Sequence, residues 1–311
     1  MRIVVAGAGG VGALIGGLVA RAGVDVAFVA RGAQLAALRE GGLHVESPRG
    51  DFQVPGLEAS DDPAALAPAD AVLVAVKGWQ VADLAPRLAP LLAGGGFAVP
   101  LENGVGAADA LAAGLGVERV VGGLCHLSAW IVAPGRVRHV GNLLRVTVGE
   151  RGGRPPGARV EALAATLRGA GVEVVVSDDI EAAVWEKFLF ICATGGVGAV
   201  TRAPVGVVRS MPETRALLTA AMEEVAAVAR ARGVRIARDA VARALGLVDA
   251  FPPETTASMQ KDVVAGRPSE LQDQIGAVVR LGRAAGVATP VHDLLLAALL
   301  PQERAARSQR P

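Results

Sequence analysis

The sequence predicts an α/β protein in which an N-terminal doubly wound parallel sheet is followed by a C-terminal all-helical domain. Three observations support this prediction. A glycine-rich loop joins an apolar strand to a helix at the N-terminus, short apolar runs alternate with helical patterns up to Ser177, and helical periodicity dominates from Asp178 onward. The length of 311 residues suits two domains, which we place at 1–177 and 178–311.

The opening segment, MRIVVAGAGGVGALIGG, defines the first strand and the first helix. Gly7, Gly9 and Gly12 have the spacing G-x-G-x-x-G after the apolar run 3–6. The first glycine allows a tight turn, the second lets a pyrophosphate approach the backbone, and the third lets helix and strand pack closely. The motif predicts a Rossmann-like dinucleotide site, and a glycine-rich turn in another α/β protein is the alternative. The expected cofactor-binding residues of this loop are Gly7, Ala8, Gly9, Gly10, Val11 and Gly12.

The same segment also raises the question of a membrane span, because residues 3–20 carry no charge. Its glycines are clustered as a turn requires, and it has no leucine-rich signal core. We therefore interpret it as a buried strand, loop and helix.

Composition makes several classes of function improbable. The formal net charge is +1 and aromatic residues are only 3%, so the chain lacks the basic patches and stacking rings of a nucleic-acid-binding protein. Cys125 and Cys192 are too few and too distant for a disulfide framework, and the four histidines lack ligand spacing. We expect a cytoplasmic protein with no metal, no nucleic acid and no membrane partner.

The second strand, over 24–30, ends at Arg31. An acidic residue at this position holds the ribose 2′-hydroxyl of NAD, whereas an arginine suits the 2′-phosphate of NADP. Asp25 lies at the opposite end of the strand. Arg31 therefore favours NADP, and the alternative is an ordinary surface arginine at the start of a helix over 34–40.

Two polar residues follow later strands at the sheet edge where ligands of doubly wound sheets bind. Lys77 follows the strand 71–76, and Asn103 follows the strand 97–101 within Glu-Asn-Gly. Their alternatives are a solvated loop lysine and a turn-forming Asn-Gly. The other elements that we expect are a hairpin over 44–54, helices over 61–67, 81–92, 107–113 and 158–170, strands over 120–124 and 172–176, and antiparallel strands over 135–149.

In the helical half, Lys187 lies in a helix that enters the apolar run FLFICATGGVGAV, whose glycines at 195, 196 and 198 are expected to interrupt it. A lysine beside so apolar a segment is suited to act as a general acid. The alternative is a lysine at the helix edge whose stem packs on apolar residues while its ammonium reaches water. We expect a helix over 211–232 and another capped by Ser269 and reaching residue 285. Glu270 would then lie in a first turn, where complementing the helix dipole is the alternative role. The polar tail after Pro301 is expected to fray.

Together these segments resemble the ketopantoate reductase (2-dehydropantoate 2-reductase) family over essentially the whole chain. The resemblance implies an N-terminal Rossmann domain and a helical domain like the C-terminal domain of 6-phosphogluconate dehydrogenase. It also implies NADPH/NADP+ as cofactor, a small 2-oxo acid as substrate, and (R)-pantoate as the product, for pantothenate and coenzyme A biosynthesis. The matching segments are GAGGVG at 7–12, Arg31, VAVKGWQ around Lys77, ENG around Asn103, WEKFLF around Lys187, and SMQKD…RPSE over 258–270.

The resemblance also assigns roles to residues. It implies that Lys187 hydrogen-bonds the ketone oxygen and acts as the general acid, and that Glu270 orients the substrate hydroxyl. Asn103 would hold nicotinamide or substrate, Lys77 would line the cofactor site, and Ser258 would contact the substrate carboxylate. Lys187 and Glu270 are thus the expected catalytic residues.

Three positions depart from the family pattern, which is rich in asparagine after the catalytic lysine and before the Ser-Met motif. Ile191, Gly195 and Thr255 stand at these positions. The alternative substrate is therefore a different 2-oxo acid or carbonyl compound. A non-catalytic NADP sensor is a rival reading, which the presence of both Lys187 and Glu270 disfavours. Residues 284–300 offer a surface for a possible homodimer.

Overall fold

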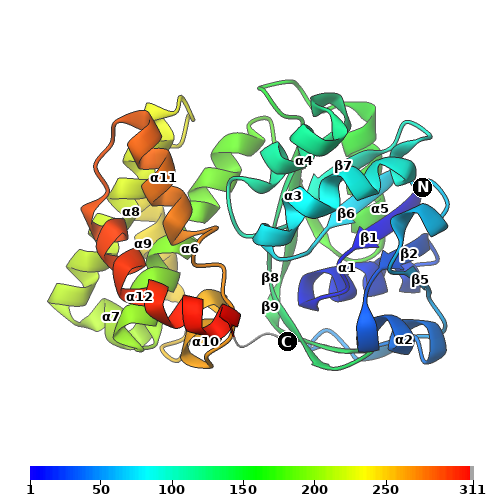
Figure 1. Cartoon of the computed structure of the whole chain (residues 1–311), viewed down its shortest axis with the longest axis horizontal. Coiled ribbons are helices and arrows are strands. Elements are labelled where there is room, and N and C mark those ends of the chain that lie inside the picture. The colour runs from blue at the N-terminus through cyan, green and yellow to red at the C-terminus, as the bar shows by residue number, and fades with distance from the viewer. Residues whose placement is uncertain (309–311) are drawn as a thin grey trace. The chain divides into compact units, whose positions relative to one another are not determined.

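The structure, a computed structural model, describes residues 1–308 and consists of two units (Figure 1). The first unit comprises Met1–Glu102 and Ala107–Ile180. The second comprises Asn103–Gly106 and the chain from Glu181 onward. The segment Asn103–Gly106 therefore groups with the helical unit, although the strand that precedes it belongs to the first unit.

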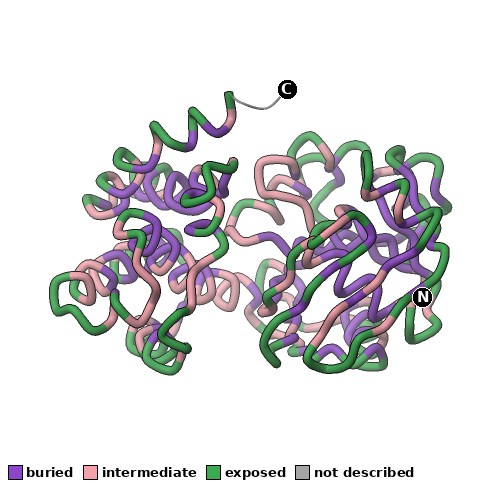
Figure 2. The backbone as a smooth tube through the Cα atoms, turned by 90° about the horizontal axis from the view of Figure 1, so that it is seen from below, coloured by how far each residue is buried: buried purple, intermediate pink, exposed green. Residues whose placement is uncertain are grey.

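The first unit is built on a parallel sheet with the strand order β5-β2-β1-β6-β7. Its central strands are apolar and almost completely buried, as expected for a sheet covered on both faces (Figure 2). Because β2 and β6 lie on opposite sides of β1, the winding of the chain reverses at β1, and ligands bind at such a switch point. The strands are β1 (Arg2–Ala6), β2 (Asp25–Val29), β5 (Glu58–Ser60), β6 (Ala71–Val74) and β7 (Phe97–Pro100).

A second sheet in this unit has the order β10-β9-β3-β4, with β8 also paired to β9. The predicted hairpin over 44–54 is confirmed by the antiparallel pair β3 and β4. The strands of this sheet are β3 (Leu43–Glu46), β4 (Phe52–Val54), β8 (Gly122–Ala133), β9 (Arg136–Gly149) and β10 (Glu173–Val176).

Two strand predictions need correction. The strand expected over 120–124 is the start of the much longer β8, and residues 135–149 form one strand, β9, rather than a pair. Gly141 and Asn142 resemble a turn, but β9 pairs with β8 on both sides of them: Val140 lies opposite Ser128 and Arg145 opposite His126, and residues 141–144 have no partner in β8. The register shifts between His126 and Ser128, so the extra residues of β9 are accommodated as an irregularity in the ladder.

Helix α1 (Gly10–Arg21) lies between the two sheets. A side chain on Gly16 would collide with Phe28 and Val5 of the parallel sheet, and one on Gly17 would collide with Leu43 of the second sheet. The uncharged N-terminal run is therefore buried in protein on both sides, which explains its composition. The other α-helices of this unit are α2 (Gly32–Glu40), α3 (Val81–Leu84), α4 (Ala107–Leu115) and α5 (Ala158–Gly169).

Two predicted helices are largely 3₁₀ turns. The segment over 61–67 contains only η1 (Pro63–Ala65), whose Asp62 cap accepts a hydrogen bond from the Ala64 N–H. The segment over 81–92 is α3 followed by η3 (Ala85–Leu92). Proline has no N–H, so Pro86 and Pro90 remove the hydrogen bonds that would continue an α-helix. Two further 3₁₀ turns are η2 (Gly78–Gln80) and η4 (Val117–Arg119).

Helices make up the regular structure of the second unit through residue 308, as predicted. Helix α6 is continuous, so the expected interruption at its glycines is wrong. Gly196 instead leaves room for Ile275 and Leu295, and Gly198 leaves room for the Gln260 side chain. The helices are α6 (Ile180–Thr201), α7 (Val205–Ser210), α8 (Pro212–Ala231), α9 (Ala240–Ala250), α10 (Ser258–Val264), α11 (Ile275–Ala285) and α12 (Pro290–Ser308).

Two more predictions in this unit are wrong. The helix expected from Ser269 begins only at Ile275, so Glu270 lies in a preceding turn and does not complement the dipole of a first helical turn. The tail after Pro301 does not fray before Ser308, because α12 continues to that residue. The last three residues of the predicted tail, 309–311, lie outside the described residues.

Helix α6 is long and apolar enough to cross a membrane by length and composition. Of its most apolar stretch of 18 residues, 56% is buried inside the protein. The core helix of a globular protein has the same length and composition.

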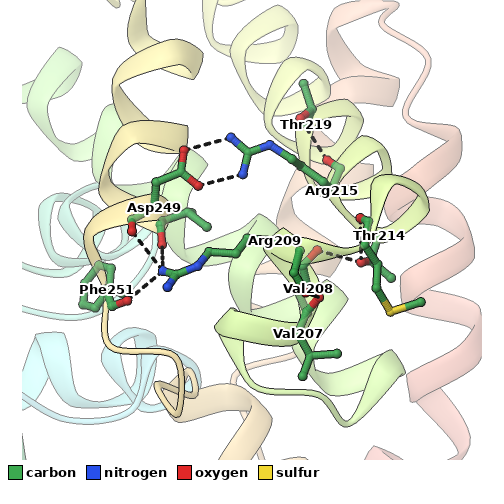
Figure 3. A network of polar contacts seen from close by, with 11 residues as sticks. Val207, Val208, Arg209, Thr214, Arg215, Thr219, Asp249 and Phe251 are labelled. Atoms are coloured by element: carbon green, nitrogen blue, oxygen red, sulfur yellow. Dashed lines mark hydrogen bonds and ion pairs between the residues drawn. The ribbon is translucent and has the colours of Figure 1, made fainter.

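An arginine cluster joins α7, α8 and the end of α9 (Figure 3). Arg209 Nη1 donates hydrogen bonds to the carbonyl oxygens of Val248, Asp249 and Phe251 at 2.8, 3.0 and 2.7 Å. These carbonyls close α9 and would otherwise lack partners. Arg215 donates two hydrogen bonds to the Asp249 carboxylate and thereby lowers the pKa of Asp249.

The segment after α9 is held to the start of α7 by its backbone. The N–H of Gly206 donates to the Pro253 carbonyl at 2.8 Å, and the N–H of Val205 donates to the Thr255 carbonyl at 2.9 Å. A side chain on Gly206 would collide with Pro253. These contacts determine the path of the chain into α10, which begins at Ser258.

The substitution Gly12→Ala is expected to lower the free energy of unfolding by about 1–3 kcal/mol, because overpacking displaces backbone. A Cβ at Gly12 would lie 1.9 Å from the Gly7 carbonyl oxygen. Gly9→Ala is the matched control, since its Cβ would find its nearest heavy atom at 3.9 Å. Urea unfolding of both variants measures the difference, and equal stabilities would contradict the packing role of Gly12.

Candidate active site

The glycine-rich loop lies at the carboxyl end of β1, at the switch point of the parallel sheet. The Gly7 N–H donates to the Val29 carbonyl at 3.0 Å, and Gly7 has a φ of 109°, which favours glycine. A side chain at Gly7 would collide with Ala75, which follows β6. Gly9 is exposed and precedes α1, whose first turn has no acidic residue. The loop thus offers backbone N–H groups to an anion without a competing carboxylate.

The neighbouring loop residues also have packing roles. A Cβ at Gly10 would lie 2.2 Å from the Ala129 carbonyl oxygen of β8, so packing within the first unit already requires a glycine there. Ala8 is buried, and Val11 packs against the apolar core. A cofactor contact of these three residues through their backbone remains a prediction.

Arg31 is exposed and immediately precedes α2, close to the carboxyl end of β2. Its guanidinium makes no hydrogen bond or ion pair with residues 1–308. Asp25, at the other end of β2, accepts two hydrogen bonds from Arg2 at 2.6 and 2.7 Å. The charged side chain at the carboxyl end of β2, the end at which ligands bind, is therefore the positive one of Arg31.

Lys77 and Glu102 lie at the ends of the neighbouring strands β6 and β7. The Lys77 ammonium nitrogen lies 5.8 Å from the ring centroid of Trp79. Glu102 is 7% exposed and accepts hydrogen bonds from the N–H groups of Val76 and Leu101, both at 3.1 Å. This carboxylate ties the two strand ends together, and it was missed in the sequence analysis although it stands beside Asn103. The signal was a charged residue directly after a buried apolar strand.

Lys187 and Asn103 form a direct pair in the second unit. The Lys187 ammonium donates a hydrogen bond to Asn103 Oδ1 at 2.8 Å, and both side chains are half-buried. An ammonium has three donors, so two remain for another acceptor. A positive charge oriented in this way is suited to stabilise negative charge that develops on a carbonyl oxygen.

Glu270 is 5% exposed and lies in the turn before α11. Burial, and after it the charge of Glu270, raise the pKa of Cys192 in α6. Lys187, Ile191 and Gly195 follow one stripe of α6 at intervals of four residues. Cys192 lies beside this stripe, so Glu270 faces the helix that carries Lys187.

A buried carboxylate on α12 holds the residue before Glu270. Glu303 is 3% exposed and accepts hydrogen bonds from Ser269 N–H at 3.0 Å and Ser269 Oγ at 2.6 Å. Arg307 Nε donates to Glu303 at 2.6 Å, and Arg307 Nη2 donates to the Ser269 carbonyl at 3.1 Å. Ser269 is therefore hydrogen-bonded to Glu303 and Arg307 and does not cap a helix.

Ser258 is exposed at the first position of α10. Its neighbour Met259 is buried, with Cε 3.2 Å from the place where a Cβ of Gly195 would lie. Gln260 is also buried and donates to the Ala203 carbonyl at 2.9 Å. The start of α10 therefore packs against the stripe of α6 that carries Lys187, whereas Ser258 makes no hydrogen bond with Lys187 or Glu270 within residues 1–308.

Among residues 1–308, no group of three or more His, Cys, Asp or Glu side chains is arranged to hold a metal ion.

Comparison with known proteins identifies the family. The family model described as ketopantoate reductase PanE/ApbA matches residues 3–153, and the model of its C-terminal part matches residues 179–303. The chain belongs to the ketopantoate reductase family. It is accordingly an oxidoreductase of that family, and the predicted family and fold class are confirmed.

The relatives are similar over nearly their whole lengths. A 2-dehydropantoate 2-reductase of Halobacterium salinarum is 33% identical over 292 residues, which cover 94% of this chain and 95% of the relative. The crystal structure of a PanE/ApbA family ketopantoate reductase from Ralstonia eutropha JMP134 has a TM-score of 0.89 at 32% identity, with 99% and 100% covered. A D-mandelate dehydrogenase solved with NADH and anilino(oxo)acetate also has a TM-score of 0.89, with 99% of both chains covered. At 21% identity, that likeness concerns the fold alone.

The substitution Glu303→Ala is expected to lower the free energy of unfolding by about 1–3 kcal/mol, because it leaves the buried Ser269 donors without an acceptor. Arg283→Ala is the control, since it removes an ion pair with Asp293 in which Arg283 is 74% exposed. Such surface pairs contribute about 0–1 kcal/mol. Denaturant unfolding compares the two, and a loss no larger for Glu303→Ala would contradict the clamp on Ser269.

Proposed function

We propose that this member of the family is an NADPH-dependent 2-dehydropantoate 2-reductase. It reduces ketopantoate to (R)-pantoate in the cytoplasm, for pantothenate and coenzyme A biosynthesis. The observation that carries the proposal is the Lys187–Asn103 hydrogen bond of 2.8 Å in the unit that also holds the buried Glu270. The names of relatives at about one-third identity support the same substrate.

The residues of the first unit fit a dinucleotide. The pyrophosphate would be held by the backbone of the loop at 7–12, where Gly9 leaves open space before α1. Arg31 would pair with the 2′-phosphate, and Lys77 would line the cofactor site. Asn103, which belongs to the second unit, would bind nicotinamide or substrate. Bound NADPH supplies the hydride for the α-keto carbon.

The residues of the second unit fit the 2-oxo acid substrate. Lys187 donates a hydrogen bond to the ketone oxygen and transfers a proton to it as negative charge develops there, while Asn103 fixes the direction of the ammonium. Glu270 accepts the hydrogen bond of the substrate hydroxyl, and Ser258 donates to the substrate carboxylate. The alcohol product leaves Lys187 neutral, and solvent returns its proton.

A second candidate function is reduction of a different 2-oxo acid or carbonyl compound. The observation that favours it is the stripe of α6 beyond Lys187, where Ile191 and Gly195 offer no polar side chain. Steady-state oxidation of NADPH with ketopantoate and a panel of other 2-oxo acids decides between the two. Preference for ketopantoate supports the first function, and preference for another acid supports the second.

The substitution Lys187→Ala is expected to lower kcat for ketopantoate by about 10²–10⁴-fold, the usual contribution of a general acid. The Kd for NADPH, measured by fluorescence titration, is expected to stay within about twofold, because the lysine acts on the ketone. Lys187→Arg keeps the charge but cannot release a proton near neutral pH, so its kcat is also expected to fall. Normal turnover in either variant would remove proton donation by Lys187 from the mechanism.

The substitution Arg31→Ala is expected to raise the Kd for NADPH by about 10–100-fold, the equivalent of one charge-assisted hydrogen-bond site. NADH lacks the 2′-phosphate, so its Kd serves as the internal control and is expected to change little. Calorimetric titration of both cofactors measures the two effects. Equal losses for NADPH and NADH would assign Arg31 a role other than the 2′-phosphate.

A further inference from the structure

We propose that Gln274 is a substrate-binding residue that selects for the hydroxyl group of the substrate. This inference rests on the proposed function and extends it to a residue that neither the sequence motifs nor the family resemblance single out. Gln274 directly precedes α11 and lies in the same turn as Glu270.

The first argument is that the Gln274 side chain makes no hydrogen bond within the described protein, although the residue is almost completely buried. The residue is 2% exposed, and its side chain makes no hydrogen bond with residues 1–308. Gln260, which is 4% exposed, shows the usual behaviour: it donates to the Ala203 carbonyl and accepts from the Ala257 N–H. The Gln274 amide is not among the fully enclosed polar atoms of residues 1–308 that lack a partner, so the small exposed part of this residue includes its polar end, which is available to a ligand.

The second argument is the position of this carboxamide beside the stripe of α6 that carries Lys187. Gln274 Oε1 lies 3.5 Å from the place that a Cβ of Gly195 would occupy. Gly195 lies two intervals of four residues beyond Lys187 on the same face of α6. A Cβ at 195 would also lie 3.2 Å from Met259 Cε. The Gln274 amide therefore lies in van der Waals reach of the stripe at residue 195.

The third argument is that the backbone connects Gln274 to the other proposed substrate residues. Its N–H donates to the Glu270 carbonyl at 2.9 Å, so the two residues are one turn apart. The preceding carbonyl, of Asp273, lies 3.4 Å from the place of a Cβ at Gly104. Gly104 follows Asn103, the partner of Lys187. One short turn thus carries Glu270 and Gln274 and packs against the Asn103 segment.

The chemistry of the pair Glu270 and Gln274 suits a hydroxyl. A carboxylate only accepts hydrogen bonds, whereas an amide NH₂ donates them. A substrate hydroxyl can donate its proton to Glu270 and accept from Gln274 Nε2, which satisfies both protein groups. A second carboxylate would be repelled by Glu270. Sites built to hydrogen-bond a substrate hydroxyl discriminate strongly against an analogue without it, because their polar groups are then left unpaired.

The test compares ketopantoate with 3,3-dimethyl-2-oxobutanoate, which has the same skeleton without the hydroxyl. Steady-state kinetics are measured for the wild-type protein and for Gln274→Leu. For ketopantoate, the variant is expected to lose about 10–100-fold in kcat/KM, mainly through a higher KM, with kcat within about threefold. For the deoxy analogue, kcat/KM is expected to remain within about twofold, since that substrate makes no bond to Gln274.

Thermal unfolding separates binding from a structural role. Gln274→Leu is expected to keep or raise the melting temperature, because an apolar side chain of similar size replaces an unpaired amide. Gln260→Leu is the matched control and is expected to lower the melting temperature, because it leaves the Ala203 carbonyl and the Ala257 N–H without their partner.

The outcomes are distinct. A selective loss with ketopantoate at unchanged stability supports the role of Gln274. A wild-type preference for ketopantoate that Gln274→Leu fully retains overturns the inference and leaves the proposed function intact. Equal losses with both substrates and a lower melting temperature also overturn it, in favour of a structural role. A wild-type protein that prefers the deoxy analogue overturns the proposed function and the inference together.

Discussion

Close packing at glycine positions of two helices determines where both parts of the candidate site lie. In α1, Gly12 touches the Gly7 carbonyl, and Gly16 and Gly17 let two sheets approach opposite sides of the helix. In α6, Gly195, Gly196 and Gly198 admit α10, α11 and α12 in the same way. A Cβ at any of these positions except Gly195 would lie within 3.0 Å of another atom and displace it, because protein interiors are packed about as densely as organic crystals. The glycine-rich loop and the Lys187 stripe are therefore held in place by close packing of their helices.

Within each unit, a buried carboxylate binds the backbone of a loop beside the candidate residues. Glu102 accepts hydrogen bonds from the backbone where β6 and β7 end, and Glu303 does the same for Ser269 before the Glu270 turn. Each buried charge is costly unless several donors surround it, and here backbone N–H groups and an arginine supply them. The backbone next to Asn103 and next to Glu270 is thus bound by a buried carboxylate in each case.

The local sequence pattern was sufficient to predict many of the helices and strands. The strand, loop and helix of the N-terminal motif were predicted because their glycine spacing and periodicity are local, and the hairpin over 44–54 was predicted because turn residues flank alternating strands. Predictions failed where distant contacts or prolines decide. The 3₁₀ turns over 85–92 follow from Pro86 and Pro90, the unbroken α6 follows from neighbours that fill its glycine gaps, and the late start of α11 accompanies the binding of Ser269 by Glu303.

The sequence by itself determined the fold class, the family and the identity of the candidate residues, because motif spacing and hydrophobic periodicity are properties of neighbouring residues. Only the tertiary structure decided which side chains meet. It paired Lys187 with Asn103, bound Asp25 to Arg2, and placed the carboxamide of Gln274 beside Gly195 with no hydrogen bond to the described residues. These outcomes depend on residues far apart in the chain, and burial and hydrogen bonding across such separations have no periodic signature in the sequence.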